Sequence, residues 1–272
     1  MNKYPAMIFA DTHAHLYLED FDHDREVVVR NAIDQGVRFI FLPNIDSSSV
    51  EGMMILADQF PGHCFPMMGL HPTSVKADYL DELTGVENEL ADRTRNYVAV
   101  GEIGIDLYWS REFEGFQHSA FSFQLDLAVK YDLPVVIHTR NSFDVAIDLI
   151  EQKNDPAIRG IFHCFGGSVK QAEQAIGLGF LLGIGGIITY KNSGLQKVVE
   201  VVGLEHLVLE TDAPFLPPVP YRGQRNESAY IPIIAQKISE IKSISIDEVA
   251  VKTTQNALTL FNLNLSIPHN PL

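Results

Sequence analysis

The stretch Asp11-Thr12-His13-Ala14-His15 follows a short apolar run, Met7 to Ala10, that predicts a buried strand. Residues two apart in a strand point to the same side, so Asp11, His13 and His15 are expected to share one face. Two imidazoles backed by a carboxylate suit a divalent metal better than an apolar core. An isolated His-x-His pattern is a weak signal, and it becomes informative only because later strand ends carry similar residues.

Similar apolar runs recur at fairly even spacing. Most are continuous rather than alternating, as expected of parallel strands that are covered on both faces. The predicted strands are Met7 to Ala10, Val37 to Leu42, Cys64 to Met68, Tyr97 to Val100, Pro134 to Ile137, Gly160 to Phe162, Phe180 to Ile184 and His206 to Leu209. Helical periodicity is found in Asp24 to Gln35, Phe116 to Tyr131, Ser142 to Gln152, Ser168 to Leu178, Asn192 to Val202, Tyr230 to Ile241 and Ile246 to Asn262.

This pattern of strand–helix units in 272 residues predicts a (β/α)₈ barrel, the TIM barrel, which commonly takes about 250 residues. Residues 1–263 are expected to form a single domain, followed by a loose tail from Asn264 to Leu272. No apolar run approaches the roughly 18 residues of a membrane span, and the N-terminus lacks the apolar core of a signal peptide. Cys64 and Cys164 lie in separate apolar runs, which favours buried thiols. These features favour a cytoplasmic protein with no membrane contact and no obligate protein partner.

The chain has a formal net charge of −15. This charge argues against a protein that binds nucleic acid through a broad basic surface. It leaves open a nucleic-acid enzyme whose few cations line one pocket. Bound metal ions would neutralise part of the negative charge.

Five predicted strand ends carry side chains that bind metals, and in such a barrel the active site lies at these ends. The residues are His13 and His15 after strand one, Glu102 after strand four, His138 after strand five, His163 after strand six and Asp212 after strand eight. A single strand-end histidine is more often a packed, hydrogen-bonded residue. Burying the carboxylates without partners would cost several kcal/mol each, so a compensating cation explains the set better. Four histidines and two carboxylates suit two ions, with Glu102 placed to bridge them.

The chain resembles the TatD family of metal-dependent deoxyribonucleases, within the wider amidohydrolase-like barrels. The resemblance spans nearly the whole chain, from Phe9 to about Phe261. It rests on six stretches in family order: Asp11 to Leu16, Gly69 to Pro72, Gly101 to Asp106, Pro134 to Arg140, His163 to Gly167 and Leu209 to Pro214.

The resemblance implies a role for each strand-end ligand. His13, His15 and Asp212 would hold one ion, His138 and His163 the other, and Glu102 would bridge them. A metal-activated water would attack phosphorus in DNA, with Asp212 orienting the water or accepting its proton. Some family members digest single strands from the 3′ end, so an exonuclease that binds DNA locally and transiently is expected. Magnesium or manganese suits phosphate chemistry, and histidine-rich ligation also tolerates zinc.

Three further residues are candidates for substrate binding. Arg140 could clamp a phosphate oxygen, although a salt bridge to Asp144 or Glu102 has comparable weight. His71 could donate to a phosphate, or it could simply form a structural turn. Arg222, in a later loop, is a weaker candidate.

Other residues near the strand ends could support the site. Asp106 and Glu210 could each hydrogen-bond a metal-binding histidine, and Glu210 could equally pair with a nearby base. Tyr108 and Trp109 could stack on bases, although packing over the top of the barrel is the more common outcome.

Two other functions remain open on the sequence alone. Related barrels hydrolyse small esters, amides or phosphoesters with similar metal clusters. Many of them carry a lysine ligand at the end of strand four, where this chain has Glu102. A non-catalytic scaffold that keeps the barrel and recruits partners is disfavoured by the complete ligand set.

Overall fold

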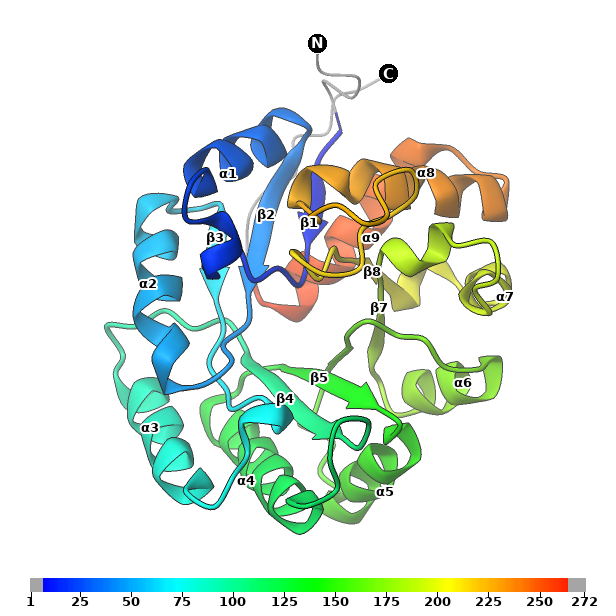
Figure 1. Ribbon diagram of the computed structural model, residues 1–272. Helices are drawn as coiled ribbons and strands as arrows, with labels where there is room; N and C mark the ends of the chain where they lie inside the picture. Colours follow the sequence, from blue (N-terminus) through cyan, green and yellow to red (C-terminus); the bar gives the residue numbers. More distant parts are fainter. Residues whose placement is uncertain (1–6, 264–272) are drawn as a thin grey trace.

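The computed structural model describes residues 7–263, and within them eight parallel strands form a ring with helices around it (Figure 1). The strands are β1 (Phe9–Asp11), β2 (Val37–Leu42), β3 (Cys64–Pro66), β4 (Val100–Asp106), β5 (Val135–Arg140), β6 (Gly160–Phe162), β7 (Leu181–Ile184) and β8 (Leu207–Leu209). The helices are α1 (Arg25–Asp34), α2 (Val50–Gln59), α3 (Tyr79–Ala91), α4 (Glu114–Tyr131), α5 (Phe143–Lys153), α6 (Val169–Gly177), α7 (Leu195–Val201), α8 (Ile231–Lys242) and α9 (Ile246–Leu260). The expected (β/α)₈ barrel is confirmed.

Backbone hydrogen bonds join two runs of paired strands into the closed ring. Strands β1 to β3 pair in one sheet and β4 to β8 in another, and all pairs are parallel. Between β3 and β4, the Gly101 N–H donates to the carbonyl of Met68 at 3.0 Å. Between β8 and β1, the Thr12 N–H donates to Leu209 and the Asp212 N–H to His13. This second junction places the ends of the first and last strands side by side.

The barrel interior is filled by apolar side chains at the end opposite to the strand C-termini. Phe39 and Phe41 lie two residues apart on β2 and both point inward. Phe261, at the end of helix α9, closes this end of the barrel. The rings of Phe41 and Phe261 stack with centroids 4.0 Å apart. Truncating a buried phenylalanine such as Phe41 to alanine costs about 3–5 kcal/mol, so this packing is a major part of the stability. The buried polar residues His13, His15, Glu102 and His163 lie at the other end, near the C-termini of the strands.

Strand β4 differs from its predicted bounds. The sequence predicts a strand that ends at Val100, whereas β4 begins at Val100 and pairs with β5 as far as Asp106. The glycine-rich run looked like a loop, but Gly104 allows the pairing because a Cβ there would collide with the carbonyl oxygen of His138. Gly104 also has φ +138°, which L side chains rarely adopt. Glu102 therefore lies inside a strand and not after one.

Most other elements lie within a few residues of their predicted positions. Helices α2 and α3 are the exceptions, because no helical range is predicted for them. Each contains a glycine, Gly52 or Gly85, which weakens the helical signal. Strand β1 extends to Asp11, beyond its predicted end, and β3 ends early at Pro66.

The remaining expectations concern the cysteines, membrane contact and the tail. Both cysteines are free, and Cys64 is buried as expected, whereas Cys164 is partly exposed. No helix in residues 7–263 combines the length and apolar character needed to cross a bilayer. The predicted tail from Asn264 to Leu272 lies outside the described residues.

Candidate metal centre

Glu102 lies at the centre of the polar end of the barrel. The pairing of β4 with β5 shifts register between Gly101 and Ile103, and such a bulge re-aims the side chain between them. Buried Asn44, just after β2, fixes this segment: its N–H donates to Gly101 and its carbonyl accepts from the Glu102 N–H at 3.2 Å. The Glu102 side chain is 2% exposed.

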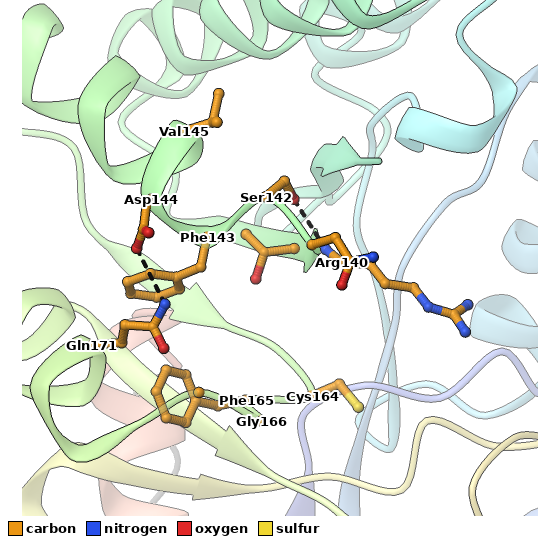
Figure 2. A pocket seen from close by; sticks show the side chains of 12 residues that line it. Arg140, Ser142, Phe143, Asp144, Val145, Cys164, Phe165, Gly166 and Gln171 are labelled. Carbon is orange, nitrogen blue, oxygen red and sulfur yellow. Dashed lines mark hydrogen bonds between the residues drawn. The ribbon is translucent and has the colours of Figure 1, made fainter. Parts of the chain in front are cut away.

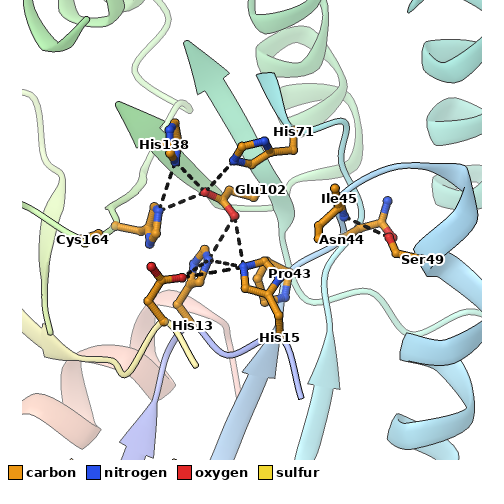
Figure 3. Close-up of polar contacts among 12 residues, drawn as sticks. His13, His15, Pro43, Asn44, Ile45, Ser49, His71, Glu102, His138 and Cys164 are labelled. Atoms are coloured by element: carbon orange, nitrogen blue, oxygen red, sulfur yellow. Dashed lines mark hydrogen bonds and ion pairs between the residues drawn. The ribbon is translucent and has the colours of Figure 1, made fainter. Parts of the chain in front are cut away.

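The two carboxylate oxygens of Glu102 face different histidines (Figure 3). Oε2 lies 3.1 Å from His13 Nε2 and 3.5 Å from His15 Nε2. Asp212 Oδ1 lies 3.8 Å from each of these two nitrogens. We call His13, His15 and Asp212 the Oε2 side.

The other oxygen, Oε1, faces three imidazoles. It lies 2.9 Å from His138 Nδ1, 2.9 Å from His163 Nε2 and 3.3 Å from His71 Nε2. We call His71, His138 and His163 the Oε1 side. The structure thus gathers the other five expected ligands, and His71 with them, around the buried carboxylate of Glu102.

Tyr17 fixes the tautomer of His15. The Tyr17 hydroxyl donates its only proton to the carbonyl of Pro43 at 2.5 Å, so its oxygen accepts from His15 Nδ1 at 2.9 Å. His15 Nε2 therefore directs a lone pair at Glu102 Oε2, another atom with lone pairs. Two such atoms 3.5 Å apart repel each other unless a cation or a proton lies beside them. The donor set on this side therefore fits a metal ion.

The histidines of the Oε1 side are held by other partners. Asp106 Oδ2 accepts from His138 Nε2 at 2.9 Å, which leaves Nδ1 toward Glu102. A carboxylate behind a metal-binding histidine orients the ring and raises its basicity. His71 differs, because its Nδ1 accepts from the Thr73 N–H at 3.2 Å. Neutral His71 therefore carries its proton on Nε2 and acts as a donor.

Glu210 lies behind His163. Its side chain is fully buried, with Oε1 accepting from the Cys164 N–H and lying 3.5 Å from His163 Nδ1. Glycine is required at position 183 of β7, because a Cβ there would collide with Glu210 Oε2. The carboxylate therefore occupies a space that the neighbouring strand keeps open for it.

Asp11 does not back the imidazoles as the sequence suggested. Its carboxylate turns to the segment that follows β8 and accepts from the Thr211 N–H at 2.9 Å and from the Thr211 hydroxyl at 2.6 Å. Burial raises the pKa of Asp11 to about 7, against hydrogen bonds from Ser228, Thr211 and His13 that lower it. Asp11 thus fastens β1 to β8, which sets His13 beside Asp212.

The charges of the cluster follow from burial and proximity. Burial acts to raise the pKa of Glu102, but the imidazoles of His163, His71 and His13 outweigh it and hold this pKa well below its usual range. Burial, together with His163, lowers the pKa of His13 well below its ordinary value. Burial acts to lower the pKa of His163, but Glu102 and Glu210 raise it well above the ordinary value. A ligating imidazole must be neutral, so a cation bound by His163 would compete with the proton that Glu102 and Glu210 favour there.

The candidate substrate-binding residues lie at different distances from the cluster. His71 is within it, whereas the exposed Arg140 guanidinium stacks on the Tyr108 ring, 3.7 Å from its centroid. Of the carboxylates expected to pair with Arg140, Asp144 accepts from Gln171 instead, and Glu102 faces the imidazoles. The Arg222 guanidinium lies 4.5 Å from the ring centroid of Tyr190.

A cleft of about 460 Å³ lies between the loops that follow β5 and β6. Phe143, Asp144, Phe165 and Gln171 line it, and the Arg140 side chain extends away from the two phenylalanines (Figure 2). None of the cluster residues lines this cleft, although Thr139 and Cys164, which do, directly follow His138 and His163 in the chain.

Two supporting residues, Tyr17 and Asn44, were missed by the sequence interpretation. Tyr17 continues the alternation of His13 and His15, so the same period-two rule would have found it. Asn44 follows the end of β2, where a search of every strand end would have included it.

The barrel and its histidine–carboxylate cluster define a class of protein, the metal-dependent hydrolases. Within that class, residues 10–262 match the family model described as TatD related DNase, and the chain belongs to this family. It is 34% identical over 259 residues to an uncharacterized metal-dependent hydrolase, YabD, of Bacillus subtilis (strain 168), covering 95% of this chain and 100% of that protein.

Solved structures show the same relationship. The crystal structure of YjjV, a TatD homolog from Escherichia coli K12, is 32% identical with a TM-score of 0.88, covering 94% of this chain and 98% of that chain. A hydrolase TatD family protein from Entamoeba histolytica shares the fold, with 24% identity and a TM-score of 0.81 over 94% of this chain and 98% of that chain.

Proposed function

We propose that this protein hydrolyses phosphodiester bonds at the ends of DNA strands with two divalent cations. One observation carries the proposal: six side chains direct their ligand atoms at the two oxygens of the buried Glu102 carboxylate, or at the nitrogens beside it. Two ions sharing one carboxylate can stabilise the attacking and leaving oxygens of a displacement at phosphorus. The match to a DNase family model supports DNA as the substrate.

The ligands divide between the two sides of Glu102. His13, His15 and Asp212 would hold one ion, and His138 and His163 the other, with Glu102 shared. When bound, the ions polarise the phosphoryl group and lower the pKa of water. Magnesium or manganese suits this chemistry, and zinc suits the imidazoles.

The chain itself supplies proton transfer and phosphate binding. The Asp212 side chain is 14% exposed, compared with 2% for Glu102, so it can accept a proton from the attacking water and pass it to solvent. His71 carries its proton on Nε2 and can donate to a phosphate oxygen.

The test uses purified protein that has been chelated and then reloaded with Mg²⁺, Mn²⁺ or Zn²⁺ in turn. Oligonucleotides labelled at the 5′ or the 3′ end, single- and double-stranded, reveal cleavage and its direction. We expect stepwise shortening from one end in the reloaded protein and none in the chelated protein. Hydrolysis of small esters or amides with every oligonucleotide left intact would overturn the proposal in favour of a small-molecule hydrolase.

A further inference from the structure

Two large aromatic side chains are exposed at the end of the barrel that carries the cluster. Trp109, in the loop after β4, is 70% exposed, and Phe215, in the loop after β8, is 51% exposed. The remaining exposed aromatics in residues 7–263 are Tyr108 and Phe116, so Trp109 and Phe215 belong to a small set. Exposed aromatic rings offer flat faces on which nucleic-acid bases can stack.

Trp109 is tied to the Oε1 side by hydrogen bonds. The N–H groups of Tyr108 and Trp109 donate to Asp106 Oδ1 at 2.9 and 3.4 Å, and the other oxygen of Asp106 accepts from His138. The Arg140 guanidinium packs 3.7 Å from the Tyr108 ring centroid and 5.2 Å from that of Trp109. The loop that presents the indole is thus fastened to a candidate metal ligand.

Phe215 is tied to the Oε2 side in the same way. Its N–H donates to the carbonyl of Asp212 at 2.7 Å, and its carbonyl accepts from the buried Asn226 side chain at 2.6 Å. Its ring centroid lies 6.2 Å from that of His15. One exposed aromatic ring is therefore anchored to each side of Glu102.

We propose that Trp109 and Phe215 stack on the two bases that flank the scissile phosphate. This inference rests on the proposed function, because it requires a nucleic-acid strand centred on the cluster. A base offers its flat face to an aromatic ring only when neighbouring bases do not cover it, so the strand that binds is unpaired at this point. The net charge of −15 gives no broad attraction for phosphates, which leaves stacking as a main source of affinity beyond the cluster.

The decisive experiment removes each ring and each base in turn. Wild-type protein and the variants Trp109→Ala and Phe215→Ala, all loaded with Mn²⁺, are assayed on a short single strand. Matched strands carry an abasic residue on the 5′ or on the 3′ side of the cleaved bond. Loss of one stacked base typically lowers affinity by roughly 5- to 100-fold, so each ring removal should raise KM by a similar factor and change kcat little.

Coupling between ring and base identifies the partners. An abasic residue on one side of the cleaved bond should raise KM for the wild type but not for Trp109→Ala. An abasic residue on the other side should raise KM for the wild type but not for Phe215→Ala. Trp109→Phe keeps a ring and should recover most of the loss. Leu80→Ala, which removes another exposed apolar side chain on α3, is the matched control and should behave like the wild type.

A second readout does not depend on turnover. Trp109 is the only tryptophan in the chain, so intrinsic tryptophan fluorescence reports on this position alone. Titration with a phosphorothioate thymidine tetramer should quench the fluorescence, and the same backbone without bases should not. Quenching should persist in Phe215→Ala at higher ligand concentration.

The outcomes separate the inference from the proposed function. If the wild type cleaves these strands and each variant keeps its sensitivity to both abasic positions, stacking is overturned and the nuclease assignment stands. If the wild type cleaves no strand and its fluorescence is unchanged by the tetramer, both are overturned. Coupling of the two rings to two different bases, together with quenching, supports the inference.

Discussion

The two sides of Glu102 obtain their negative charge differently. On the Oε2 side a single carboxylate, Asp212, lies among the ligand atoms themselves. On the Oε1 side the ligand atoms are imidazoles, and the carboxylates of Asp106 and Glu210 lie behind two of them.

This difference has consequences for how each side fails. Loss of Asp212 would remove both a ligand and the local charge, whereas loss of Asp106 would leave the imidazoles and Glu210 in place. The Oε2 side also has the more modest support, because Tyr17, which lies behind His15, is neutral, whereas the groups behind His138 and His163 are carboxylates. We therefore expect a graded series of effects across the centre.

The largest effect is expected at the shared carboxylate. Glu102→Gln keeps the shape and removes the charge, so both ions should be lost. Activity should fall by at least about 10³-fold, since even a supporting group behind a ligand is worth 10- to 100-fold. Metal content per chain and kcat/KM on a labelled oligonucleotide measure the effect. Glu205→Gln, at a carboxylate that is 58% exposed, is the matched control. Retention of both ions would refute a shared bridge.

Asp212→Asn should affect one side only. Metal content should fall toward half that of the wild type, because the Oε1 ligands are untouched. Loss of a proton acceptor typically costs about 10²- to 10⁴-fold in rate, and kcat should fall within that range. Chelator competition, read as two release steps in the wild type, should show one step in the variant. Two unchanged steps would contradict the division into sides.

Asp106→Asn should weaken the other side without emptying it. Removal of a carboxylate behind a ligating histidine typically costs about 10- to 100-fold in metal affinity, so the release step that survives in Asp212→Asn should shift by this factor. The same chelator titration gives the measurement. A shift in the release step that Asp212→Asn loses would instead contradict the placement of Asp106 behind the Oε1 ligands.

The smallest effect is expected for Tyr17→Phe. The hydroxyl makes a neutral hydrogen bond, which contributes about 0.5–1.5 kcal/mol, so metal affinity on the Oε2 side should fall by roughly tenfold or less. If Tyr17→Phe lowers metal affinity more than Asp106→Asn does in the same titration, charge behind the histidines does not account for the difference between the two sides.

The part of this centre that the sequence reveals is the part with a strong local signal. Histidines and acids directly after apolar runs could be placed together because parallel strands in a barrel end at one rim. His71 was found in the same way, but its role as a donor depends on the short turn that begins at Pro72, where the Thr73 N–H reaches Nδ1.

Other features lacked such a signal for physical reasons. The extent of β4 was missed because Gly101 and Gly104 read as a loop, although the close approach of β5 requires them. Trp109 was expected to pack over the barrel, yet it is mostly exposed, and nothing local distinguishes the two outcomes. Arg225 binds Asp24 through two hydrogen bonds of 2.8 and 2.7 Å across 201 positions, a distance in the chain that no sequence window spans.

The hydrogen bonds between Asp11 and Thr211 also bear on the order in which the protein is made. They join residues 200 positions apart, and they set His13 from the start of the chain beside Asp212 near its end. A ribosome-bound nascent chain holds His13 and His15 early but has no complete cluster until Asp212 has been synthesised. The partly made protein would therefore carry exposed imidazoles without their acidic partner, and full cation uptake would mark completion of the ring.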